Sequence, residues 1–438
     1  MSGRIPTARL AGLFALAGCL ALAAGAALPL GPGRLVAVAA PLAALALAAV
    51  DANGCPRPAE LRAGRGLSGP LRQGRPATVT LALAWNPGAG ARGARPLWWA
   101  DGAPPALVGR APQGRALLRA GEACRASYAV LPQARGAARW SGPRATLGSP
   151  WGLWALRLDA AVATEATVYP GPPPADGPAR EAAERGAPAP GDAGLEFDGV
   201  RPYLPGEDAR RMAWRATARR DQPVLRRHRP ERGRRLLLVL DAGRRSAVAP
   251  SEAPGAVTRL DAFCAAALRV AAAALGAGDQ VGIALLSSGQ TRLLAPAAGP
   301  AALHTLATAL AEVRPSAGDP DLRQAAAALL RWPRDALLWF GEAPSQQEAR
   351  GPAALLGALR RTGPVAWLSV RPERLGPAPA GERAEFLERA EREALAARAQ
   401  ALRPFAAAGV LARQAPAAHL GALALDTYRR LAPGGGPG

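Results

Sequence analysis

Two long apolar runs near the N-terminus constrain the fold of this chain more than any other feature. Residues 10–30 contain no charged side chain and consist almost wholly of Leu, Ala, Gly and Phe. A bilayer-spanning helix needs roughly 20 such residues. A second apolar run, residues 35–50, follows after a short Gly-Pro-Gly-Arg turn and contains Pro41. The pattern predicts two transmembrane helices in residues 1–51. A cleaved signal peptide is the alternative, although its apolar core would not continue into a second run.

The arginines around these runs predict an orientation. Arg4 and Arg9 precede the first run and several arginines follow the second, whereas only Arg34 lies between the runs. Because basic residues stay on the cytoplasmic side, both ends of the hairpin are expected in the cytoplasm. We therefore expect a protein of the cell inner (cytoplasmic) membrane, with its soluble domains facing the cytoplasm.

All 54 basic residues are arginine, and the net charge is +21. A lysine-free chain rich in Ala, Arg, Gly and Pro indicates coding bias as much as selection for charge, so the charge is weak evidence for nucleic-acid binding. A basic surface beside a cytoplasmic leaflet is nevertheless attracted to anionic lipid, which makes the lipid bilayer an expected partner. The four cysteines are scattered and have neither metal-ligand nor redox-motif spacing.

Residues 60–169 contain short, partly alternating apolar segments separated by turns. Residues 78–83 alternate with period two, as a half-buried strand does, and residues 127–131 and 166–169 are similar. The segments predict a small β-sandwich, in which the tryptophans of this region pack in the core and at the edges. Residues 170–194 are rich in Pro, Ala and Gly and predict a linker.

Residues 234–432 change to apolar strands alternating with helices. The strands are expected at 236–240, ending at Asp241, and at 280–287, 336–340, 365–370 and 410–413. The helices are expected at 257–275, 301–313, 322–331, 382–408 and 419–431. This alternation predicts an α/β fold, a doubly wound (Rossmann-like) domain with helices on both faces of a mostly parallel sheet.

The most informative segment is residues 195–233, which contains a dense arginine cluster around two aromatic residues. It resembles the signature of domain-of-unknown-function family fifty-eight. The matching residues are Glu196, Phe197, Gly199, Arg201, Tyr203, Gly206, Arg210, Trp214, Thr217, Ala218, Arg219 and Glu231. The paired N-terminal helices and residues 149–154 are also similar to that family.

The resemblance implies a C-terminal von Willebrand factor A-like domain, no enzymatic activity, and partnership with a MoxR-type AAA+ ATPase in envelope-related assembly. It also implies a membrane-anchored scaffold or adaptor. The candidate partner-binding residues are those of the arginine-rich segment: Arg201, Tyr203, Arg210, Arg211, Trp214, Arg215 and Arg219. The competing interpretation of this segment is a solvated face with intramolecular ion pairs.

A von Willebrand A domain often holds Mg²⁺ through D-x-S-x-S at the end of its first strand. Here Asp241 remains, but Gly243 and Arg245 replace the two hydroxyl residues, and Glu342 is the acidic residue after the 336–340 strand. A guanidinium beside a dication is unfavourable. We therefore predict a degenerate site without metal or other cofactor, in which Asp241 pairs with an adjacent arginine or caps the next turn.

The sequence has no P-loop, nucleophile elbow or zinc-binding helix motif, so we expect no enzyme. Of the three histidines, His304 and His419 lie in apolar helical stretches and are expected to pack, while His228 lies in the arginine-rich segment. The alternative function is a membrane-proximal nucleic-acid-binding protein that uses the arginine cluster.

Overall fold

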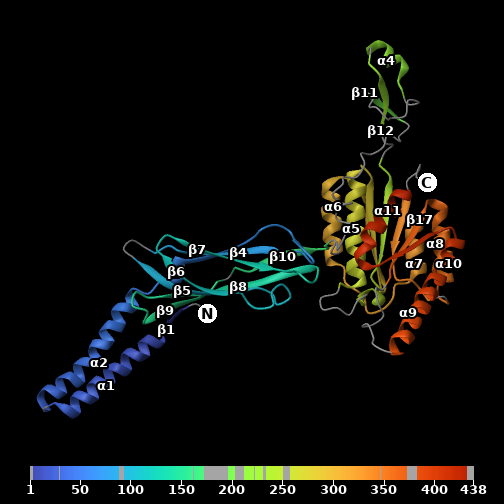
Figure 1. The fold of residues 1–438 in the computed structure, drawn as a ribbon. Helices are drawn as coiled ribbons and strands as arrows, with labels where there is room; N and C mark the ends of the chain where they lie inside the picture. The colour runs from blue at the N-terminus through green and yellow to red at the C-terminus, as the bar shows by residue number, and fades with distance from the viewer. Residues whose placement is uncertain are drawn as a thin grey trace. The chain divides into compact units, whose positions relative to one another are not determined.

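The computed structural model describes residues 3–28, 30–87, 93–160, 162–171, 196–202, 212–220, 222–229, 233–249, 257–345, 347–371 and 382–431. The chain divides into two compact units, residues 1–168 and 169–438 (Figure 1). Each unit is described by itself below. Tyr203, Arg210 and Arg211 of the signature segment, and most of the expected linker, lie outside the described residues.

The first unit begins with two apolar helices, α1 (Ala8–Ala27) and α2 (Leu30–Asn53). Both are long and apolar enough to cross a membrane, with mean hydropathies of 2.1 and 2.2. The predicted apolar hairpin is therefore confirmed, and α2 continues through Pro41 because the rest of the helix is Ala- and Leu-rich. A short strand, β1 (Gly3–Pro6), precedes α1 and pairs with β9 (Trp154–Asp159) of the following domain.

The remainder of this unit consists of a three-stranded sheet, β2-β4-β7, and a larger sheet that includes β1 and β9. In β4, Val79, Leu81 and Leu83 are buried while their neighbours in sequence are not, so the predicted alternation places one face in the core. The strands with bounds not yet given are β2 (Leu61–Leu67), β3 (Leu71–Arg72), β4 (Ala77–Trp85), β5 (Ala94–Gly102), β6 (Gln113–Arg119), β7 (Ala123–Val130), β8 (Gly136–Gly148) and β10 (Thr164–Tyr169).

The second unit is built on a six-stranded sheet of order β15-β14-β13-β16-β17-β18. All neighbours pair in parallel except β14 and β15, which are antiparallel. The continuous apolar runs of the central strands are buried on both faces, as a covered parallel sheet requires. The strands are β13 (Arg235–Asp241), β14 (Gln280–Ser287), β15 (Gln290–Ala297), β16 (Ala336–Phe340), β17 (Val365–Val370) and β18 (Leu411–Ala415).

Helices cover both faces of this sheet, so the chain is α/β and doubly wound in this unit (Figure 1). One face packs against α5 (Arg259–Gly276), α6 (Gly299–Glu312) and α11 (Leu420–Arg430). The other packs against α7 (Leu322–Leu330), α8 (Arg350–Leu359) and α10 (Arg403–Ala407). The helix expected at 382–408 is two helices, α9 (Glu382–Ala401) and α10, because Pro404 begins a new helix.

The signature segment contains an antiparallel pair, β11 (Glu196–Pro202) and β12 (Val224–Arg229), with α4 (Trp214–Arg220) between them. Thr217 ties α4 to β12, since its Oγ1 accepts a 3.2 Å hydrogen bond from Val224 N. Four short 3₁₀ turns complete the described elements: η1 (Pro58–Glu60), η3 (Arg244–Ala247), η4 (Arg360–Thr362) and η5 (Ala417–His419).

Candidate functional site

The strand order indicates a candidate binding site at one edge of the second unit's sheet, the edge formed by the carboxyl ends of its parallel strands. The chain moves outward in opposite directions from β13 and β16, and ligands of open α/β sheets bind at the carboxyl ends of strands at such a switch point. Asp241 ends β13, and Glu342 follows the end of β16. The structure thus brings these two carboxylates, which the sequence singled out, to the same edge.

Asp241 caps the turn that follows β13. Its Oδ1 accepts a 2.8 Å hydrogen bond from Gly243 N. Burial raises the pKa of this carboxyl to about 6, and the negative charge of Asp319 adds to the rise, while the Gly243 N–H and Arg245 oppose it. Gly243 has no room for a side chain, because a Cβ there would lie 2.8 Å from Pro320 Cδ and 3.0 Å from Asp241 Oδ1.

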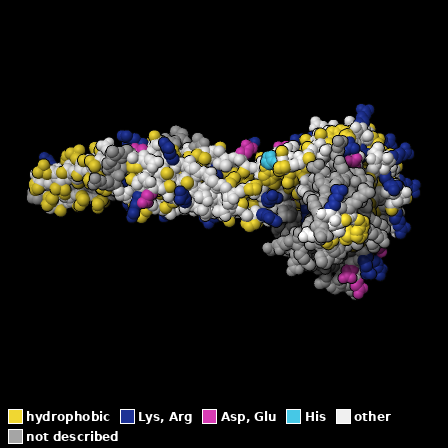
Figure 2. All heavy atoms as spheres, turned by 90° about the horizontal axis from the view of Figure 1, so that it is seen from above, with side chains coloured by type: hydrophobic (Ala, Val, Ile, Leu, Met, Phe, Trp, Pro, Cys, Tyr) yellow, Lys and Arg dark blue, Asp and Glu magenta, His cyan; other side chains and the backbone are white. Residues whose placement is uncertain are grey.

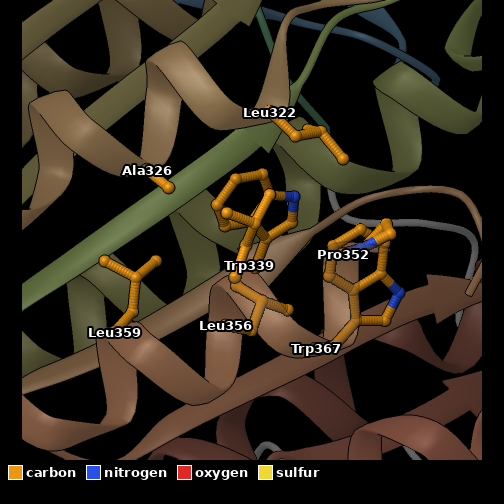
Figure 3. A pocket seen from close by; sticks show the side chains of 8 residues that line it. Leu322, Ala326, Trp339, Pro352, Leu356, Leu359 and Trp367 are labelled. Carbon is orange, nitrogen blue, oxygen red and sulfur yellow. The ribbon is translucent and has the colours of Figure 1, made fainter. Parts of the chain in front are cut away.

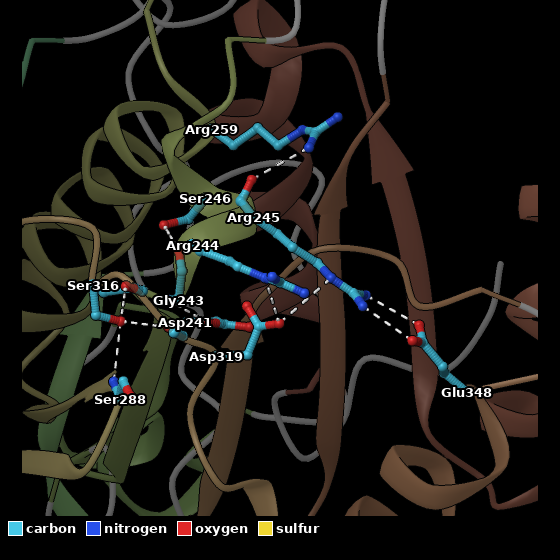
Figure 4. A network of polar contacts seen from close by, with 12 residues as sticks. Asp241, Gly243, Arg244, Arg245, Ser246, Arg259, Ser288, Ser316, Asp319 and Glu348 are labelled. Atoms are coloured by element: carbon cyan, nitrogen blue, oxygen red, sulfur yellow. Dashed lines mark hydrogen bonds and ion pairs between the residues drawn. The ribbon is translucent and has the colours of Figure 1, made fainter.

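The two arginines of η3 pair with carboxylates from later segments and not with Asp241. Arg244 Nε lies 3.2 Å from Asp319 Oδ2. Arg245 donates two hydrogen bonds to Glu348, of 3.0 and 3.1 Å, and its Nε is 3.8 Å from Asp319 Oδ2 (Figure 4). This bidentate pairing lowers the pKa of Glu348 to about 2. Of the two expected arrangements for Asp241, the structure has the capped turn.

Glu342 faces two further arginines. Arg259, in the first turn of α5, forms an ion pair with it at 3.2 Å, and Arg398 of α9 lies 4.0 Å away. Burial raises the pKa of Glu342, and the arginines only partly oppose this rise. Arg259 also donates a 3.3 Å hydrogen bond to the backbone carbonyl of Arg245. Arginine–carboxylate pairs therefore connect the segments after β13 and β16 with each other and with helices α5 and α9.

The backbone beneath these pairs is held by a serine between α6 and α7. Ser316 Oγ donates to the carbonyl of Ala242 or of Gly318, at 3.0 and 2.8 Å, and accepts a 3.0 Å hydrogen bond from Ser288 N (Figure 4). Arg244 N also donates to Gly318 O at 3.2 Å. We call the eight charged residues of this edge the strand-end cluster: Asp241, Arg244, Arg245, Arg259, Asp319, Glu342, Glu348 and Arg398.

The cluster does not fit a resident dication. Gly243 offers no hydroxyl ligand and has no space for one, and the guanidiniums of Arg244 and Arg245 already pair with the nearby carboxylates. Within the described ranges, no group of three or more His, Cys, Asp or Glu side chains has an arrangement that could hold a metal ion. The cluster presents charged groups of both signs to solvent: 65% of the Arg244 side chain and 43% of the Arg245 side chain are exposed, together with 38% of Asp319 and 50% of Glu348.

Of the predicted partner-binding residues, the structure places only some. Arg201 lies in β11, Arg215 in α4, and Arg219 is exposed on α4. Trp214 begins α4 and is 65% exposed. The signature segment leads into the amino end of β13, whereas the strand-end cluster lies at its carboxyl end, so the predicted partner-binding segment and the predicted degenerate metal site are at opposite ends of this strand.

The described residues also include two hollows and two exposed histidines. A crevice of about 10 Å³ lies between the sheet and helices α7 and α8, against Trp339 and Trp367 (Figure 3), and has room for about one water. A hollow of about 640 Å³ on the first unit is lined mainly by the loop after β5 and the end of β7. His304 and His419 were expected to pack, but the side chains of both are exposed.

A second polar site, which the sequence did not predict, joins the apolar helices to the sandwich. Asp51 of α2 is 1% exposed, and its carboxylate accepts hydrogen bonds from Ser149 Oγ, from Trp151 N at 2.8 Å and from Leu153 N at 2.9 Å. Trp154 Nε1 donates to Ala48 O at 2.9 Å. We call this the hairpin joint. Its signals in the sequence are a carboxylate at the end of an apolar run and residues 149–154, the segment that resembles the family.

A comparison with protein families agrees with the signature. The model of the family described as "Protein of unknown function DUF58" matches residues 199–338. No curated protein sequence matches the chain. Among solved structures, the SpRpn10 VWA domain is 10% identical, with 47% of this chain and 98% of that chain covered and a TM-score of 0.30. An uncharacterized membrane spanning protein from Vibrio fischeri is 13% identical, with 45% and 99% covered and a TM-score of 0.17. Residues 199–338 are thus similar to the DUF58 family that the signature resembles.

Proposed function

We propose that this chain is a membrane-anchored, cytoplasm-facing protein-interaction scaffold or adaptor. The observation that carries the proposal is the strand-end cluster, in which Arg244 and Arg245 are held in fixed positions yet remain partly exposed. A surface of this kind suits the recognition of acidic groups on a partner, because a guanidinium can exchange one carboxylate for another.

The anchoring half of the proposal rests on the first unit. Helices α1 and α2 are long and apolar enough to span a bilayer, and both connect to the sandwich at the same end of the hairpin. The hairpin joint therefore keeps the sandwich at one side of the membrane. The arginine distribution around the apolar runs favours the cytoplasmic side.

The proposed partner is an AAA+ ATPase of the MoxR type, working with this chain in envelope-related assembly. Support for this partner comes from the resemblance of the signature segment. The strand-end cluster supplies the docking surface, and the exposed side of α4, with Trp214 and Arg219, is a second surface on the same chain.

The experiment is affinity capture of the detergent-solubilised full-length protein from its own cells, with and without ATP, followed by mass spectrometry. We expect an AAA+ ATPase to be enriched by the wild type. The double variant Arg244→Gln/Arg245→Gln should capture only a small part of the ATPase that the wild type captures. The matched control Arg292→Gln/Arg331→Gln removes two exposed arginines of the same domain and should capture it normally.

Equal capture by the Arg244→Gln/Arg245→Gln variant, with unchanged thermal unfolding, would refute docking at the strand-end cluster. The pair Arg210→Glu/Arg215→Glu then tests the signature segment in the same assay. Recovery of nucleic acid in place of the ATPase, lost at moderate salt, would instead support the nucleic-acid-binding alternative.

A further inference from the structure

The end of the helical hairpin that meets the sandwich carries exposed arginines and an exposed tryptophan. Arg4 lies on β1, Arg9 in the first turn of α1, and Arg57 shortly after the end of α2, and all three are exposed. Trp151, in the loop between β8 and β9, is 49% exposed. We call these four residues the collar.

Hydrogen bonds hold the collar around the two helix ends. Trp151 N donates to Asp51 of α2 at 2.8 Å, and Trp151 O accepts from Arg9 Nη1 at 3.4 Å. Arg4 is opposite Leu156 in the pairing of β1 with β9. The joint thus places Arg9 beside Trp151, 142 residues away in the sequence, and the β1–β9 pairing places Arg4 at the same base of the hairpin.

The positive charge of the collar is not neutralised by the carboxylates beside it. Asp51 is buried and uses its oxygens for N–H and O–H donors of the hairpin joint. Glu60 accepts from the backbone N of Arg57 at 3.3 Å, not from its guanidinium. Among the described residues, no carboxylate forms an ion pair with Arg4, Arg9 or Arg57. Arg9 is also at the positive end of the α1 dipole, where a cation costs helix stability.

The length of the hairpin places the collar at a membrane surface. The 20 residues of α1 span about 30 Å, the thickness of a bilayer core. Figure 2 shows hydrophobic side chains over the hairpin and arginines where it meets the sandwich. Tryptophan favours the interface between lipid and water, and guanidinium groups bind phosphate oxygens.

We infer that the collar binds the phosphate groups of anionic phospholipids, with Arg4, Arg9 and Arg57 as ligands and Trp151 inserted between the head groups. This inference rests on the proposed membrane anchoring and adds a lipid class to it. The collar then fixes the depth of the hairpin joint in the membrane. An arginine near an anionic surface contributes about fivefold in affinity.

The test uses the full-length protein, purified in detergent and titrated with phosphatidylglycerol or phosphatidylcholine, with bound lipids counted by native mass spectrometry. The wild type should prefer phosphatidylglycerol, and the variant Arg4→Gln/Arg9→Gln/Arg57→Gln should lose at least about tenfold of that preference. The control Arg72→Gln/Arg75→Gln/Arg139→Gln removes three exposed arginines at the other end of the same sandwich. It should keep the preference.

The inference is overturned if the collar variant retains the preference, or if the control loses as much. Thermal unfolding of the first unit, unchanged in both variants, shows that the joint is intact. Membrane extraction of the wild type with alkaline carbonate separates the two proposals. A protein released by carbonate refutes the anchoring itself, whereas an embedded protein without lipid preference refutes only the collar.

Discussion

The hairpin joint and the strand-end cluster each contain a carboxylate at the end of an apolar element, Asp51 and Asp241, but they differ in the charged groups around it. Asp51 is 1% exposed and accepts hydrogen bonds from a serine hydroxyl and two backbone N–H groups. At the strand ends, Asp241 also accepts from a backbone N–H, but the neighbouring Asp319 and Glu348 form ion pairs with arginines that are partly in water. Fixed backbone donors make a permanent joint, whereas exposed ion pairs contribute little stability and can change partners.

The largest effect is expected from Asp51→Ala. The substitution leaves the Ser149 hydroxyl and the N–H groups of Trp151 and Leu153 without their acceptor in a buried site. Three lost hydrogen bonds to a charged group should lower the free energy of unfolding by about 3 to 5 kcal/mol. Thermal unfolding of the solubilised protein should show the transition of the first unit at a lower temperature.

Asp51→Asn is the control, since the amide keeps one acceptor oxygen in the same place. It should lose less than half as much stability as Asp51→Ala. The transition of the second unit is an internal reference and should not move. A mild effect of Asp51→Ala would mean that the helices and the sandwich are not joined through this carboxylate.

Asp241→Asn should change how stability depends on pH. The pKa of Asp241 is about 6 in the folded protein, and the ordinary value is 3.8. At pH values between these two, the folded state therefore binds a proton that the unfolded state has released. The stability from this group is therefore fully present below about pH 4 and falls as pH rises through 6. Above that range the Asn variant, which can still accept from Gly243 N, should be more stable than the wild type by about 3 kcal/mol.

Chemical denaturation of both proteins from pH 4 to 8 measures this difference. Glu348→Gln provides the opposite case. The pKa of Glu348 is lowered to about 2, so the stability that the ionised carboxylate gives the wild type is lost as pH falls from the ordinary value toward 2. A wild-type profile parallel to that of Asp241→Asn would show that Asp241 is not held as the structure has it.

A smaller loss is expected from Gly243→Ala. The new Cβ would lie 2.8 Å from Pro320 Cδ and close to the carboxylates of Asp241 and Asp319, so the turn must shift. We expect a loss of about 1 to 2 kcal/mol in denaturant unfolding. Gly276→Ala is the matched control, because a Cβ there meets open space, and it should be neutral or slightly stabilising. Equal results for the two alanine variants would contradict the close packing around Gly243.

Local patterns in the sequence predicted much of the fold. The apolar run before Asp241 predicted β13, and the two uncharged runs predicted α1 and α2. The antiparallel strand β15 did not stand out, because it is an edge strand with alternating exposure and contains Pro296. The histidine prediction failed because a helix with many alanines has little contrast between its buried and exposed faces.

The sites depend on contacts that local patterns do not contain. The sequence identified Asp241 and the arginines after it, but Asp319 and Glu348 are 75 and 103 residues from the arginines they bind. The hairpin joint brings Asp51 to Ser149 across 98 residues. Carboxylates and arginines are common throughout the chain, so only the folded sheet selects which of them meet.

The smallest effect, and the one that best separates binding from stability, concerns Arg245 and Glu348. Their side chains are 43% and 50% exposed, so a double-mutant cycle with Arg245→Gln and Glu348→Gln should give a coupling of only about 0.5 to 1 kcal/mol, reduced by high salt. The side chains of the Arg139–Glu165 pair of the sandwich are more exposed, at 78% and 60%, so this pair should give a smaller coupling energy. If the Arg245 variant loses partner capture while the coupling stays this small, the arginine acts through the partner and not through the fold. A coupling near that of a buried pair, several kcal/mol, would instead make the strand-end cluster a second permanent joint.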